Sequence, residues 1–99
     1  MASSKPKIEM EKELVLFLKR ELNNNSYNGT QYHQTLLYLL SGKAANNSSL
    51  MQVCRCLMHQ YNKLLETEHA NPYSEKTTNV YVRLHYFRRK LNTEVQKLL

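Results

Sequence analysis

The stretch LMQVCRCLMHQYNKLL, residues 50–65, carries the strongest helical pattern in the chain. Its apolar residues recur at the i, i+3, i+4, i+7 spacing that places side chains on one face of an α-helix; they are Leu50, Val53, Cys54, Leu57, Met58, Tyr61, Leu64 and Leu65. Ser49 and Gln52 form a capping-box pattern before the first turn. Asn71 and Pro72 are expected to end the helix, because the residue before a proline avoids helical backbone angles. The stretch therefore predicts a long amphipathic helix that begins at Ser49.

Two shorter apolar stripes precede this helix. They predict helices over residues 7–22 and 31–41, with Gly42 as the stop signal of the second. The sequence of 99 residues contains only two glycines and two prolines, which is too few turn residues for a many-stranded sheet protein. We predict an all-α fold, a single domain of about four helices over residues 1–99 with a flexible N-terminus at residues 1–6.

The last helix begins between Ser74 and Asn79 and runs to Leu99. Its apolar residues form a narrow seam of the kind found in coiled coils; they are Val80, Leu84, Phe87, Leu91, Val95 and Leu98. A helix from Lys76 to Leu99 is about 36 Å long. A compact domain of 100 residues is about 34 Å across, so this helix crosses the whole domain or projects from it. The narrow seam and the small core favour a homodimeric bundle. The alternative is a four-helix bundle formed within one chain.

Catalysis and metal binding find little support in the composition. Aspartate is absent, and the four histidines share no motif and no i, i+4 spacing; they are His33, His59, His69 and His85. Cys54 and Cys56 are two apart within a predicted helix, so their side chains point in different directions and we expect free thiols. No glycine-rich loop is present to hold a phosphate. We predict that the protein is not an enzyme and takes no cofactor, metal or small-molecule substrate.

The sequence shows no membrane signal. No apolar run approaches the roughly 18 residues that a membrane span needs, and residues 1–6 lack the apolar core of a signal peptide. We expect a cytoplasmic protein, with the nucleus as the second choice, and no membrane partner.

Positive charge is concentrated in the last quarter of the chain. The whole sequence has 14 Lys and Arg residues against eight Asp and Glu residues, a net charge of +6. Residues 76–99 hold six of these basic residues against Glu94 alone, a net charge of +5. A localised basic element is typical of a protein that binds a polyanion.

The basic residues of this segment form a regular row. Arg83, Lys90 and Lys97 are seven residues apart, which places them along one side of a helix at intervals of about 10 Å. Tyr86 and Thr93 lie beside them, with Asn79 extending the row. Cations neutralise phosphates, and hydroxyl and amide groups reach sugar oxygens. The predicted nucleic-acid-binding residues are Lys76, Arg83, Tyr86, Arg88, Arg89, Lys90, Thr93 and Lys97. The alternative is a solvated face whose charges flank the seam.

The predicted function is sequence-independent nucleic-acid binding that acts by sequestration. No zinc-finger, homeodomain or RNA-recognition signature is present. A long, straight basic helix suits reading of the backbone and shape of a duplex, which is how double-stranded RNA is commonly bound. DNA and single strands remain open as ligands. The alternative function is a helical adaptor that binds an acidic or helical protein partner.

At the level of class, a small, basic, all-helical dimer is similar to the RNA-silencing suppressors of insect nodaviruses, which clamp duplex RNA. The similarity rests on size, charge and helical composition. It implies a viral protein that suppresses RNA silencing by sequestering double-stranded RNA.

Overall fold

The computed structural model describes residues 10–24, 31–71 and 73–99, and in these residues the regular structure is entirely helical. The four helices are α1 (Lys12–Leu22), α2 (Gln31–Leu40), α3 (Ser48–Ala70) and α4 (Glu75–Gln96). The predicted all-α domain of four helices is thus confirmed. The N-terminus at residues 1–6, predicted to be flexible, lies outside the described residues.

The start of α1 differs from its prediction. The helix begins at Lys12 rather than at residue 7, with Met10 and Glu11 outside it; residues 7–9 are outside the described part of the chain. Glu11 has extended backbone angles, φ −58° and ψ 139°. Its carboxylate accepts a hydrogen bond at 2.8 Å from Arg55 of α3. Glu11 is therefore the N-cap of α1: its backbone stays outside the helix, while its carbonyl accepts a hydrogen bond from the Val15 N–H at 3.0 Å.

The end of α2 follows the prediction closely. The helix ends at Leu40, one residue before the expected boundary. Gly42 then adopts a positive φ of 83°. Residues other than glycine rarely take this conformation, so Gly42 is the stop signal that the sequence predicts.

The cap of α3 is Asn47, and the predicted capping box at Ser49 is wrong. The Asn47 side chain accepts a hydrogen bond from the Leu50 backbone N–H at 3.0 Å. Asparagine is among the strongest N-cap residues because its short side chain reaches a free N–H of the first turn. The helix therefore begins at Ser48, which leaves Ser49 inside the first turn.

Ser74 fixes the start of α4. Its hydroxyl accepts a hydrogen bond from the Thr77 N–H at 3.2 Å, and the buried Thr77 hydroxyl donates to the Asn71 carbonyl at 2.8 Å. These bonds close the turn between α3 and α4. At its other end α4 stops at Gln96, three residues before the predicted end, and Lys97 is its C-cap.

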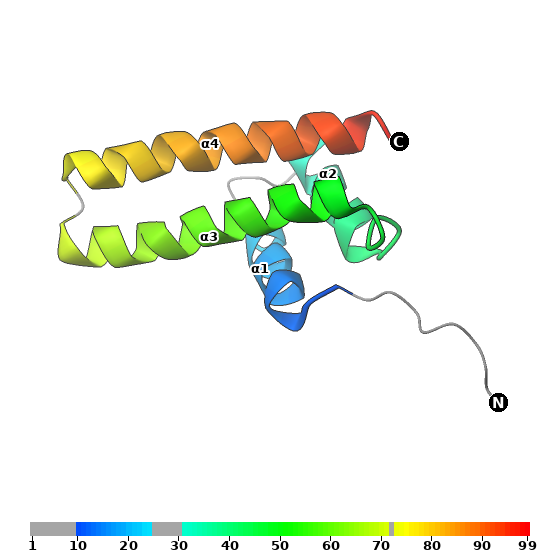
Figure 1. The fold of residues 1–99 in the computed structure, drawn as a ribbon, viewed down its shortest axis with the longest axis horizontal. Coiled ribbons are helices and arrows are strands. Elements are labelled where there is room, and N and C mark those ends of the chain that lie inside the picture. The colour runs from blue at the N-terminus through cyan, green and yellow to red at the C-terminus, as the bar shows by residue number, and fades with distance from the viewer. Residues whose placement is uncertain (1–9, 25–30, 72) are drawn as a thin grey trace.

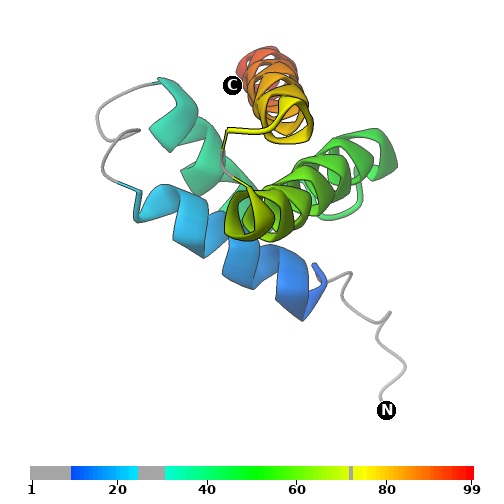
Figure 2. The same ribbon diagram turned by 90° about the vertical axis from the view of Figure 1, so that its left-hand side faces the viewer.

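The helices α3 and α4 form a long antiparallel hairpin (Figure 1). α1 packs against α2 and α3, and α2 also packs against α4. Figure 2, which looks along the hairpin, shows α1 and α2 on one side of it. α1 lies against the middle of the hairpin, and α2 lies near the end away from its turn (Figure 1). The turn end extends beyond α1 and α2 (Figure 1).

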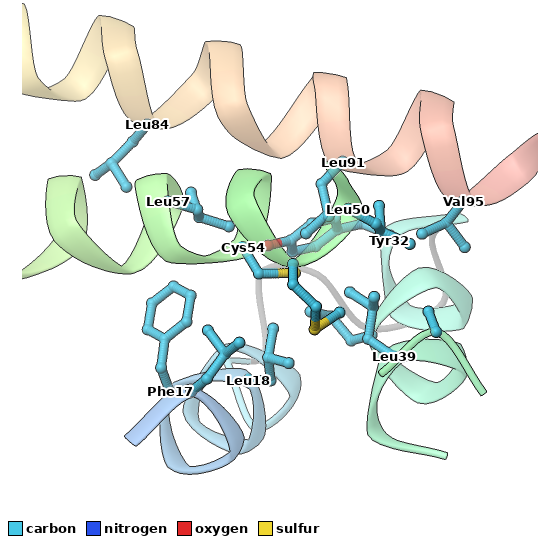
Figure 3. Close-up of a cluster of buried hydrophobic side chains, with 14 of the residues drawn as sticks. Phe17, Leu18, Tyr32, Leu39, Leu50, Cys54, Leu57, Leu84, Leu91 and Val95 are labelled. Carbon is cyan, nitrogen blue, oxygen red and sulfur yellow. The ribbon is translucent and has the colours of Figure 1, made fainter. Parts of the chain in front are cut away.

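The core lies where the four helices meet, as Figure 3 shows. It joins Leu18 of α1, Leu39 of α2, Leu57 of α3 and Leu91 of α4, all fully buried. The seam of α4 belongs to this core: Val80, Leu84, Leu91 and Val95 are buried, Phe87 is partly buried and Leu98 is exposed. Packing within one chain covers the seam, and this matches the intramolecular alternative. The homodimer stays a prediction, because the structure contains a single chain.

Candidate nucleic-acid interface

One exposed strip of α4 carries basic and neutral polar residues in alternation. We call it the basic stripe; it consists of Lys76, Asn79, Arg83, Tyr86, Lys90, Thr93 and the C-cap Lys97. Its members are three and four residues apart in turn, the spacing that keeps side chains on one side of a helix. All seven are exposed. The stripe runs along the helix beside the buried seam.

The four cations of the stripe are evenly spaced. Lys76, Arg83, Lys90 and Lys97 are seven residues apart. Two helical turns separate each from the next, which corresponds to about 10 Å along the axis and about 31 Å from first to last. Because the residues sit on a single straight helix, this spacing is built into the fold. The helix therefore fixes the points from which the four basic side chains extend.

Most of these cations are free to bind an external anion. Among the described residues, the ion pairs are Arg55–Glu11, Arg88–Glu21 and Lys97–Glu94. The Lys97–Glu94 pair, at 3.2 Å, is solvent-exposed, and exposed pairs of this kind contribute little. Lys76, Arg83 and Lys90 take part in none of the three. Their charges face solvent.

The helix α3 adds a cation that the sequence did not reveal. Lys63 lines a shallow groove together with Lys76, Asn79 and Arg83 of the stripe. Glu66 and Thr67 line the same groove. Lys63 and Arg83 are each ten residues from Tyr73 in the turn, so an antiparallel hairpin brings them opposite each other. That symmetry is the signal that could have placed Lys63 beside the stripe.

Tyr86 stands at the middle of the stripe in a second shallow depression. The depression also has Arg89, Lys90 and Thr93 on its walls, together with Val82, His85 and Glu94. The Tyr86 ring packs edge-on against Phe87, with centroids 5.2 Å apart. The Lys90 ammonium lies 5.9 Å from its centroid, within cation–π range. The structure thus brings together four of the predicted site residues: Tyr86, Arg89, Lys90 and Thr93.

Arg88 faces the other way and belongs to the fold. Its guanidinium makes two hydrogen bonds of 2.9 Å to the carboxylate of Glu21 in α1. The side chain of Glu21 is 2% exposed and that of Arg88 14%. The Tyr32 hydroxyl of α2 donates a third hydrogen bond to Glu21 at 2.6 Å. We therefore leave Arg88 out of the interface that the sequence predicts.

The Tyr32 hydroxyl is held in its protonated form. Burial, reinforced by the negative charge of Glu21, raises the pKa of Tyr32 far above its usual range. The hydroxyl therefore remains a hydrogen-bond donor at any ordinary pH. Tyr32, Glu21 and Arg88 tie α2, α1 and α4 together, and so fix the rotation of α4 that exposes the basic stripe.

No other chemistry emerges from the described residues. They contain no group of three or more His, Cys, Asp or Glu side chains placed to hold a metal ion. Cys54 and Cys56 are free thiols, as expected, and burial raises the pKa of the Cys54 thiol to about 12. A helix with the length and apolar character of a membrane span is absent from the same residues.

Comparisons of the chain with models of protein families, with curated proteins and with solved structures found no match.

Proposed function

We propose that the protein binds duplex RNA independently of sequence through the basic stripe, and that it acts by sequestering the duplex without turnover. One observation carries the proposal: four exposed cations stand at equal intervals along one side of a single helix. Charges spaced along a straight line fit the phosphates of a duplex backbone, which are themselves regularly spaced.

A duplex suits the stripe better than a single strand does. Proteins that bind single strands without sequence preference place successive bases on several aromatic side chains. The stripe contains one aromatic residue, Tyr86. Its other members are cations and short polar groups, which contact phosphates and sugars. The stripe therefore matches a ligand whose bases are paired and stacked internally.

Among duplexes, RNA is the favoured ligand. The A-form minor groove is wide and shallow and displays hydroxyl groups along the backbone. The major groove of A-form RNA is too deep and narrow for side chains to read the bases. A straight helix that carries charges and small polar groups can contact such a surface by shape, without reading sequence.

The test is a gel-shift titration of the triple variant Arg83→Ala, Lys90→Ala, Lys97→Ala against duplex RNA, duplex DNA and single strands. We expect weaker binding to every duplex sequence alike. Each lost phosphate contact should also reduce the slope of log affinity against log salt, by about 0.9 for a B-form duplex. In a homodimer each substitution occurs twice, so the reduction per substitution approaches about 1.8.

A matched control removes the same charge elsewhere. Lys12, Lys19 and Lys43 are exposed and lie off the stripe, so their triple alanine variant has the same net charge as the test variant. It should keep most of the affinity and the salt slope. If both variants lose affinity equally, binding follows total charge and the stripe is not the site. If the stripe variant folds and binds duplexes as the native protein does, the proposal is wrong and the acidic-partner adaptor takes its place.

A further inference from the structure

We propose that Asn79, Tyr86 and Thr93 make the protein prefer RNA over DNA by hydrogen-bonding the ribose 2′-hydroxyl groups of a bound duplex. This inference rests on the proposed function and names the residues that decide its ligand.

Each of the three neutral residues lies between two cations of the stripe. Tyr86, for example, is three residues after Arg83 and four residues before Lys90. These separations correspond to about 4.5 Å and about 6 Å along the helix axis. When the cations contact phosphates, the neutral side chains face the sugars between them. The regular alternation gives every phosphate-binding group a polar neighbour at the ribose.

Hydrogen bonding separates these three residues from the similar residues of α4. The helix contains seven Asn, Thr and Tyr residues. Four of them bond within the protein: Thr77 to the Asn71 carbonyl, Thr78 to the Ser74 carbonyl, Tyr81 to Glu68 and Asn92 to Thr35. The remaining three are Asn79, Tyr86 and Thr93. Among the described residues none of their side chains has a hydrogen-bond partner, and all three are exposed on the stripe.

The chemistry of these groups matches the 2′-hydroxyl. A hydroxyl both donates and accepts hydrogen bonds, and so do the side chains of Asn, Thr and Tyr. The 2′-hydroxyl is the group that lets a protein distinguish RNA from DNA. DNA offers the same phosphate oxygens, but it lacks the 2′-hydroxyl that the neutral side chains would bond in RNA. One hydrogen bond of this kind changes affinity by about 2- to 12-fold.

Tyr86 is the best placed of the three. The edge-on contact with Phe87 and the Lys90 ammonium over its ring restrict the ring on two sides. Phe87 itself packs against the core. The Tyr86 side chain is 56% exposed, so its hydroxyl reaches solvent on the stripe beside Lys90. Replacing tyrosine by phenylalanine removes this hydroxyl and leaves the ring and its contacts.

The test is the double variant Tyr86→Phe, Thr93→Val, which keeps shape and charge and removes two hydroxyls. Affinity is measured by competition gel shift with RNA and DNA duplexes of the same sequence. We expect RNA affinity to fall about 5- to 150-fold for each chain that contacts the duplex, because each chain loses two hydrogen bonds. DNA affinity should change less than about 2-fold, and the salt slope should stay the same because no phosphate contact is removed.

The control is the double variant Tyr81→Phe, Thr78→Val. It removes the same two functional groups from positions where they bond within the protein. The ratio of RNA to DNA affinity should not change. A third probe, a 2′-fluoro RNA duplex, keeps the A-form but lacks the hydroxyl. The native protein and the Tyr86→Phe, Thr93→Val variant should bind this duplex equally.

The outcomes separate this inference from the proposed function. If the native protein binds no duplex, both are wrong. If the charge variant loses duplex binding while the Tyr86→Phe, Thr93→Val variant keeps the native RNA-to-DNA ratio, the stripe binds nucleic acid and only the role of the neutral residues is rejected. A loss of RNA and DNA affinity in equal measure also rejects it.

Discussion

Glu21 is the one charged side chain among the described residues that is fully buried. A carboxylate out of water is tolerated only when its oxygens are satisfied. Arg88 and Tyr32 supply three hydrogen bonds from two other helices. Removing one partner of such a pair leaves an uncompensated charge, and this destabilises a protein far more than the pair itself stabilises it.

Arg88→Ala should therefore lower the free energy of unfolding by about 3–5 kcal/mol. The matched control is Arg89→Ala, the adjacent and exposed arginine, which should change stability by less than about 0.5 kcal/mol. Urea unfolding followed by circular dichroism gives both values. Equal effects at the two positions would show that the Glu21 ion pair is not structural.

A compensating variant checks the same reasoning. Replacing Glu21 and Arg88 together by leucine removes both charges at once. Buried pairs replaced by apolar residues of similar volume are often neutral or stabilising. The double variant should therefore be more stable than Arg88→Ala alone.

Neither side of this pair was predicted from the sequence. Glu21 continues the spacing of Leu14, Phe17 and Leu18 on the buried face of α1, but a glutamate is almost never fully buried unless it is paired. Its partner could not be found in this way. Arg88 lies 67 residues away, and no local pattern states which helix will meet α1.

At the level of helices, apolar spacing predicts well which segments form helices, because burying one face is what makes a helix stable in a protein. The ends of a helix are harder to predict, because several polar residues near a boundary can act as its cap. Asn47 and Ser49 are such competitors, and the structure selects Asn47.

This choice predicts a difference between two neighbouring substitutions. Asn47→Ala should reduce the free energy of unfolding by about 1 kcal/mol, in the range 0.5–2 kcal/mol, because the Leu50 N–H loses its acceptor. Ser49→Ala should have little effect, because Ser49 is exposed in the first turn. Thermal or urea unfolding of the two variants measures the difference. A larger loss at Ser49 would restore the capping box that the sequence suggests.

The basic stripe was mostly predictable, because residues seven apart on one helix share a side whatever the rest of the fold does. Two features were not. The orientation of Arg88 depends on Glu21, and the equal spacing of Lys63 and Arg83 from Tyr73 places Lys63 beside the stripe only once α3 and α4 are known to form one hairpin. The sequence also could not show whether the apolar seam of α4 packs within one chain or against a second chain, because both kinds of packing use the same spacing.

At the scale of the whole molecule, the two ends of the hairpin differ in whether other helices pack against them. α1 contacts α3 through the Phe17–Tyr61 ring pair, and α2 contacts α4 through the Thr35–Asn92 hydrogen bond. Beyond these contacts, towards the turn, α3 and α4 pack only against each other (Figure 1). Segments with fewer buried contacts open locally at lower free energy than the rest of a protein.

Amide hydrogen exchange should therefore follow a gradient along the hairpin. We expect residues 63–70 and 75–83 to exchange sooner than residues 50–57 and 88–95, although both sets are helical. Exchange followed by mass spectrometry resolves segments of this length. Equal protection at both ends would mean that the hairpin opens as one unit, or that its turn end is covered in solution by something else.

The ion pair between Glu21 and Arg88 also has a consequence for synthesis on the ribosome. The two residues are separated by 67 positions, and at about 5 to 20 residues per second the second is made about 3 to 13 s after the first. During that interval the nascent chain can form α1 and α2, but the carboxylate between them has no arginine. The Glu21 carboxylate therefore gains its arginine only when α4 docks against α1 and α2. In a nascent chain halted before residue 88, the surface of α1 and α2 around Glu21 should stay uncovered.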